Sequence, residues 1–268
     1  MADDSKLKPM GLGLSIVLFG IPSVVFFLIT RVLIPYFREN SSTHPILVWF
    51  ISGGLFLFIP LFVLTLILYK SDKYDLDMKT LIMRFRLTEL HRQDWIWSLC
   101  AFLLILILMG VIMGLWKLLS LHLGLMPLDT TAPFLQFNPL RGAEVLFLLV
   151  WIPFFFFNIV GEELLWRGYI LPRQELTFGR YAWFINGILW TFFHLFFGLH
   201  LLILLLPSLF IIPYVVYRRQ KTLIGIIIHA LLNGVDYGVI ASSQKPTMVQ
   251  YIIRKRYGVL LQSMEKSE

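Results

Sequence analysis

Charged residues are scarce in this chain. Asp, Glu, Lys and Arg make up 15% of its 268 residues, whereas soluble domains carry roughly 25%. Hydrophobic residues make up 58%, and the mean hydropathy is +0.78. These values exclude a soluble globular domain, and we expect residues 1–268 to form a single transmembrane domain.

Cysteine and several enzyme motifs are also missing. The only cysteine is Cys100, inside an apolar run, so no internal disulfide can form and the redox compartment is not indicated. The absence of HExxH, GxSxG and GxGxxG excludes HExxH zincins, lipase-like serine hydrolases and dinucleotide enzymes. No linker or internal repeat is evident, and the lack of inverted repeats argues against a carrier. No cleavable signal peptide is expected, because the first apolar stretch is long enough to span a membrane.

Long runs without formal charge predict the membrane-spanning helices. A bilayer core about 30 Å thick needs roughly 20 helical residues. Four runs meet or approach this length: 9–30, 45–69, 95–116 and 145–161. The longer run 181–217 is expected to form two helices with a turn at Gly198–His200. A last run begins near Thr222 and fades after Asp236. The expected fold is therefore all-α, a polytopic membrane helical bundle of seven to eight transmembrane helices. The segment VQYIIRKRYGVLL (249–261) is either interfacial or the eighth span.

Lysine and arginine favour one orientation of these spans. Most of them fall in segments on the same side as the N-terminus: 6–8, 70–92, 167–180 and 218–221. The positive-inside rule therefore predicts a cytoplasmic N-terminus in a multi-pass membrane protein. Cations of the tail, such as Lys245 and Arg254, contradict a seven-span arrangement and favour an eighth crossing. The net charge of +7 indicates anionic membrane lipid as a partner and no nucleic acid.

The apolar runs nevertheless contain ionisable residues at helical spacing. In GEELLWRG (161–168), Glu163 and Arg167 are four residues apart and can pair on one helix face. Glu162 points about 100° away around the helix axis and is left to face another element. If this helix ends near Leu171, Glu162 lies well inside the membrane.

Two later helices carry similar pairs. Trp190 and His194 are four residues apart, and so are His229 and Asn233. Counted along their helices, the histidines fall at a depth similar to that of Glu162. Ionisable residues at such depth are costly, and by default they mark a functional site that faces a water-filled cavity.

These residue types support two chemistries. A buried carboxylate with a neighbouring His can remove a proton from water, while a second His and an Asn amide can donate hydrogen bonds to a developing oxyanion. That set is sufficient to hydrolyse an amide with no cofactor. Glu162, His194 and His229 can instead hold Zn²⁺ with one open position. The sequence leaves both versions open.

Three short motifs resemble those of a known family. EELLWR, WTFFH and HALLN, which begin at Glu162, Trp190 and His229, fit the EExxxR, (F/W)xxxH and HxxxN motifs of the CAAX protease and bacteriocin-processing (CPBP) intramembrane proteases. They occur in the family's order on successive hydrophobic helices. The motif-bearing catalytic region is expected at about 145–240.

The resemblance implies a role for each motif residue. Glu162 would be the general base that activates water, with His194 beside it. His229 and Asn233 would form the oxyanion site. Glu163, Arg167 and Trp190 would support these four, the first two by their ion pair and Trp190 by packing and shaping the chamber.

The resemblance also implies an activity. It predicts an intramembrane endopeptidase that acts on a membrane-associated peptide or a lipidated, CAAX-type protein, with its active site open toward the cytoplasm. Family members include the endoprotease that removes the last three residues of prenylated CAAX proteins, and bacterial relatives are linked to bacteriocin immunity. The alternative is a non-enzymatic membrane scaffold or immunity protein of the same fold. The complete set of Glu162, His194, His229 and Asn233 favours the enzyme.

Overall fold

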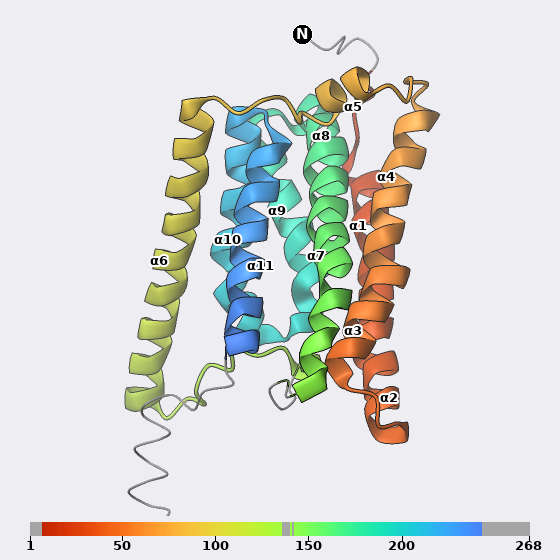
Figure 1. The fold of residues 1–268 in the computed structure, drawn as a ribbon. Coiled ribbons are helices and arrows are strands. Elements are labelled where there is room, and N and C mark those ends of the chain that lie inside the picture. The colour runs from red at the N-terminus through yellow and green to blue at the C-terminus, as the bar shows by residue number, and fades with distance from the viewer. Residues whose placement is uncertain (1–6, 136–139, 141, 243–268) are drawn as a thin grey trace, which may run out of the picture.

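The structure, a computed structural model, describes residues 7–135, 140 and 142–242, and within these residues it contains helices and no strand. The helices stand side by side as one bundle, and the chain passes repeatedly between its two ends (Figure 1). The expected all-α fold is confirmed.

The two N-terminal spans are each longer than their charge-free runs. Helix α1 (Leu12–Leu28) continues into α2 (Ile34–Asn40), and α3 (Pro45–Gly53) continues into α4 (Ile59–Ser71). A five-residue π-helical segment joins the two halves of each span, η2 (Ile29–Leu33) in the first and η3 (Gly54–Phe58) in the second.

A proline follows each π-helical segment in the described chain. Pro35, Pro60 and Pro172 lie in the first turn of α2, α4 and α8, directly after η2, η3 and η6. Proline has no N–H and its ring collides with the carbonyl four residues earlier. A π segment adds one residue to the turn, so the backbone can pass the proline without ending the helix.

The remaining helices follow in order. They are α5 (Met78–Arg84), α6 (Arg92–Leu123), α7 (Phe147–Glu163), α8 (Leu171–Phe178), α9 (Ala182–Phe193), α10 (Leu199–Arg219) and α11 (Thr222–Ser242), with η6 (Leu164–Ile170) between α7 and α8 and short 3₁₀ turns at 133–135, 142–146, 179–181 and 194–197. The expected turn at Gly198–His200 is present, and Gly198 has a φ of 92°, which favours glycine.

Two expected helix ends are wrong. The helix that carries Glu162 passes Leu171 and ends at Phe178, because the π segment carries it past Pro172. Helix α11 begins at Thr222 as expected but runs to Ser242 rather than fading after Asp236.

Five helical stretches of the described residues are long and apolar enough to cross a membrane: Leu12–Asn40, Pro45–Ser71, Arg92–Leu123, Gly142–Phe197 and Leu199–Arg219. The fourth holds both α7–α8 and α9, between which the chain reverses near Gly179 (Figure 1). The first part of α11, Thr222–Gly234, is a shorter apolar stretch. A multi-pass membrane protein is thus supported, but the count of seven to eight spans is not confirmed. Segment 249–261 lies outside the described residues, and the orientation stays a prediction.

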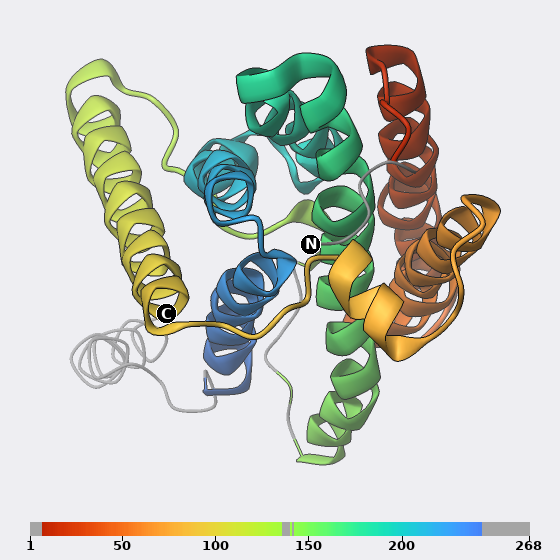
Figure 2. The ribbon, with the colours of Figure 1, turned by 90° about the horizontal axis from the view of Figure 1, so that it is seen from above.

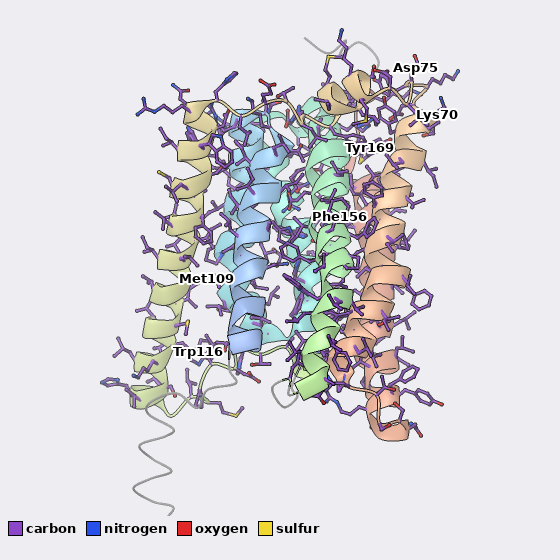
Figure 3. The ribbon with its side chains drawn as sticks, viewed as in Figure 1. Lys70, Asp75, Met109, Trp116, Phe156 and Tyr169 are labelled. Atoms are coloured by element: carbon purple, nitrogen blue, oxygen red, sulfur yellow. The ribbon has the colours of Figure 1, made fainter. Side chains whose placement is uncertain are left out.

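Helix α6 lies at the edge of the bundle, as the view from above shows (Figure 2). Its buried residues, Asp94, Ser98, Ala101 and Ile105, form one stripe in its first half. Most of its other large apolar side chains are exposed, which suits contact with lipid. Figure 3 shows Met109 and Trp116 along this helix, while charged Lys70 and Asp75 lie at the upper end of the bundle.

Candidate active site

The candidate site is built on the end of α7. Asn158, Glu162 and Glu163 lie on its last two turns, and η6 follows at once. All three side chains are buried, with Glu163 fully so. A π segment next to buried acids changes which residues face the bundle interior, and such segments are frequent at functional sites.

Glu162 is held by two hydrogen bonds from different elements. Trp190 Nε1 of α9 donates to its Oε2 at 2.8 Å, and Asn158 Nδ2, one turn earlier on α7, donates to its Oε1 at 3.1 Å. Each carboxylate oxygen keeps a second acceptor position. Trp190, expected to pack and shape the chamber, therefore also fixes the orientation of Glu162.

Glu163 forms the expected pair with Arg167 and also reaches α11. Its Oε1 lies 3.3 Å from Arg167 Nη1 and 3.0 Å from His229 Nδ1. The guanidinium of Arg167 lies over the Trp190 ring, with Cζ 3.5 Å from the ring centroid. Neither Glu163 Oε2 nor any nitrogen of Arg167 has a hydrogen-bond partner among the described residues.

Gly225 allows α11 to approach Glu163 closely. A Cβ atom at this position would overlap Glu163 Oε2 and would lie 3.0 Å from Val216 Cγ2. Any larger residue would therefore push α11 away from α7 and move His229 away from Glu163.

Both histidines contact the ring of Trp190. The ring centroid of Trp190 is 5.1 Å from that of His194 and 5.4 Å from that of His229. His194 Nδ1 lies 3.0 Å from the carbonyl oxygen of Trp190, which can only accept, so we assign the proton to Nδ1. Its Nε2 is then left as an acceptor. Both histidines are buried, with 8% and 5% of their surfaces exposed.

Asn158 links the Glu162 and Asn233 positions and was missed by the sequence reasoning. Its Oδ1 accepts a hydrogen bond from Asn233 Nδ2 at 3.0 Å, while its Nδ2 donates to Glu162. The signal was present, because Asn158 and Glu162 are four residues apart on one helix face.

The structure thus brings the predicted residues into one buried cluster. Direct contacts join Glu162, Glu163, Arg167, Trp190 and His229, Asn158 adds Asn233, and His194 joins through Trp190. The three motif-bearing helices α7, α9 and α11 each contribute to it. The roles assigned to these residues remain proposals.

The residues do not fit the zinc version of the site. Within the described part of the chain, no three His, Cys, Asp or Glu side chains are arranged to hold a metal ion. The expected set of Glu162, His194 and His229 is therefore not arranged as a metal site. His229 also turns its Nδ1 toward Glu163 rather than toward Glu162.

Comparison with known proteins supports the motif assignment. Residues 144–235 match a family model described as type II CAAX prenyl endopeptidase Rce1-like. The match contains all three motifs and every residue of the cluster. A search of curated proteins found no match, and neither did a search of solved structures. The resemblance to the CPBP family is confirmed over residues 144–235, and this segment is Rce1-like.

Proposed function

We propose that the protein is an intramembrane endopeptidase that hydrolyses a peptide bond of a membrane-associated peptide or a lipidated, CAAX-type protein. The observation that carries the proposal is the convergence of the three motifs on one buried polar cluster, with Glu162 held by Trp190 and Asn158. The Rce1-like match over the same residues supports a protease at the level of the family.

Glu162 is the proposed general base. After it accepts from Trp190 and Asn158, each of its oxygens can still accept a proton from water. The water oxygen attacks the carbonyl carbon while its proton passes to Glu162, and the same proton then moves to the leaving amine as the C–N bond breaks. His194 assists through Nε2, which accepts the second hydrogen of the water and orients it.

Asn233 and His229 are the proposed oxyanion donors. Because Asn233 uses one N–H on Asn158, its second N–H remains for the substrate oxygen. His229 points Nδ1 at Glu163, so Nε2 can donate only when the ring is an imidazolium, whose charge the Glu163 carboxylate balances. Donors fixed in advance inside a dry site stabilise the developing negative charge strongly.

The cluster lies within a bundle of apolar helices, several of them long enough to cross a membrane, and this limits the substrate class. The substrate must enter from the membrane or from its surface, which suits a peptide carrying a lipid or an apolar segment. With the N-terminus on the cytoplasmic side, the site would open toward the cytoplasm.

The test is peptide cleavage by the purified, detergent-solubilised protein. A pool of prenylated and unprenylated peptides is offered to the wild type, Glu162→Gln and His229→Ala, with and without a metal chelator. We expect cleavage by the wild type that the chelator leaves intact and that both variants lose. Normal cleavage by Glu162→Gln would contradict the role of this residue. No cleavage by any form would favour a non-enzymatic scaffold or immunity protein.

A further inference from the structure

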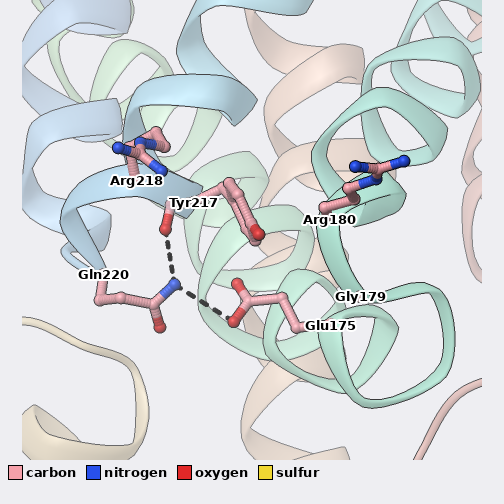
Figure 4. A pocket seen from close by; sticks show the side chains of 6 residues that line it. All are labelled: Glu175, Gly179, Arg180, Tyr217, Arg218 and Gln220. Carbon is pink, nitrogen blue, oxygen red and sulfur yellow. Dashed lines mark hydrogen bonds between the residues drawn. The ribbon is translucent and has the colours of Figure 1, made fainter.

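A second polar feature lies at one end of the bundle, apart from the cluster. A pocket of about 330 Å³ opens between the α8–α9 turn and the end of α10, lined by Glu175, Gly179, Arg180, Tyr217, Arg218 and Gln220. Figure 4 shows Tyr217 between the two arginines, with Glu175 and Gln220 on one side of the pocket. None of these residues has a role in the proposed reaction.

The one acid of the pocket is already neutralised. Glu175 accepts two hydrogen bonds from Arg86, at 2.8 and 3.0 Å, and a third from Gln220 Nε2 at 3.2 Å. Gln220 also donates to the carbonyl of Tyr217, which fixes the pocket wall (Figure 4). An anion entering the pocket would therefore meet a balanced ion pair rather than an unscreened carboxylate.

The two arginines at the pocket, by contrast, have no acidic partner among the described residues. Arg180 contacts only the hydroxyl and ring of Tyr181, and Arg218 makes no ion pair or hydrogen bond with a described side chain. The neighbouring cations Arg219 and Lys221 are both paired with Asp94. Two uncompensated positive charges therefore border one pocket.

The surroundings identify the level of the pocket in the membrane. It lies at the end of α10, a helix apolar and long enough to span. Aromatic side chains gather beside it: Tyr181 is exposed, and the rings of Trp183 and Tyr214 are 5.1 Å apart. Tyrosine and tryptophan at the end of a spanning helix are typical of the headgroup level, where the anionic groups are lipid phosphates.

We infer that this pocket binds the phosphate of an anionic phospholipid headgroup, with Arg180 and Arg218 contacting the phosphate oxygens. Guanidinium groups suit this role because they offer parallel N–H donors to phosphate. The inference does not depend on the proposed protease activity.

The test uses the purified protein in neutral detergent micelles. Phosphatidylglycerol, phosphatidylcholine or inorganic phosphate is titrated in, and the rise in Tm gives the midpoint concentration. The variant Arg180→Gln/Arg218→Gln is compared with Arg92→Gln. Arg92 is a matched control, because it is an exposed arginine at the same end of the bundle, two residues from the Asp94–Arg219 contact.

We expect phosphatidylglycerol alone to raise the Tm of the wild type and of Arg92→Gln at the same midpoint. The double variant should need at least about tenfold more lipid. If the double variant has a lower Tm before lipid is added, the two single variants are titrated instead, and each should show a smaller shift of the midpoint.

Three outcomes would overturn the inference. An unchanged midpoint in the double variant would remove the pocket as the site. An equal loss in Arg92→Gln would indicate general surface charge. A full response to inorganic phosphate would assign the pocket to a free anion rather than to lipid.

Discussion

Two buried carboxylates, Asp94 and Glu163, each face two cationic or basic groups. They differ in how many of their oxygens accept hydrogen bonds. Asp94 Oδ1 accepts from Arg219 Nε and Nη2 at 2.9 and 2.7 Å, and its Oδ2 accepts from Lys221 and the backbone of His91, both at 2.8 Å. Among the described residues, Glu163 uses only Oε1, for Arg167 and His229, and its Oε2 has no hydrogen bond.

The difference is consistent with a structural contact at Asp94 and with the proposed functional site at Glu163. Asp94 connects the start of α6 to the α10–α11 turn, and both of its carboxylate oxygens accept hydrogen bonds from groups of the same chain. Around Glu163 and Arg167, several polar atoms have no hydrogen-bond partner in the part of the chain that the structure describes, which lowers stability. Native proteins accept such a loss mainly at sites that serve a function.

The largest effect on stability is expected from Glu163→Gln. This change leaves Arg167 as a buried charge without an anionic partner and should lower the free energy of unfolding by about 3 kcal/mol. Cleavage should also fall at least about tenfold, because His229 loses its carboxylate. Denaturant unfolding and peptide cleavage measure the two effects. Adding Arg167→Met should restore stability but not cleavage, and wild-type stability of Glu163→Gln alone would contradict the importance of the pair.

The corresponding change at the other carboxylate, Asp94→Asn, should affect stability alone. We expect a loss of about 2 kcal/mol, less than for a fully buried pair, because Arg219 and Lys221 are partly exposed and screened. Cleavage below the melting transition should stay within about twofold of wild type, a difference of less than 0.5 kcal/mol. A large fall in cleavage by the folded variant would refute the separation of the two sites.

Gly225→Ala tests the close approach of α11 to Glu163. The added methyl group overlaps Glu163 Oε2, so we expect about 1–2 kcal/mol of destabilisation, measured by thermal or denaturant unfolding. Gly110→Ala on α6 is the control, because no heavy atom lies within 4 Å of its Cβ position. It should be neutral or slightly stabilising, since Ala favours helix over Gly. Equal effects of the two changes on the free energy of unfolding would mean that helix propensity, and not contact with Glu163, determines the effect of Gly225→Ala.

The smallest stability effect is expected at Asn158, a positioning residue. Asn158→Leu removes both amide contacts and should lower kcat about tenfold with little change in KM. A change in Tm without a change in kcat would assign Asn158 to packing only.

Hydropathy and spacing predicted much of this molecule. The charge-free runs located the helices because a spanning helix must satisfy its backbone internally and present apolar side chains to lipid. The four-residue spacing of Glu163 and Arg167 predicted their pair. The break at Gly198 was also expected, since glycine readily adopts its positive φ.

The remaining features depend on information that hydropathy does not contain. The π segments shift the hydrogen-bond register without changing composition, and only the prolines that follow, such as Pro172, hint at them. The expected helix end near Leu171 was wrong for this reason. The hydrogen bond between Trp190 and Glu162 joins residues 28 positions apart, so it depends on how α7 and α9 pack.

The most direct test of the account places Glu162→Gln and Asp94→Asn side by side, with peptide cleavage and Tm measured on the same purified samples. We predict that Glu162→Gln loses cleavage by at least about 10²-fold but lowers the Tm less than Asp94→Asn does, because Gln keeps one of the two acceptor oxygens. Asp94→Asn should lose Tm and keep cleavage. The reverse pattern, with cleavage retained by Glu162→Gln and lost by folded Asp94→Asn, would contradict the assignment of the catalytic site to the α7–α9–α11 cluster.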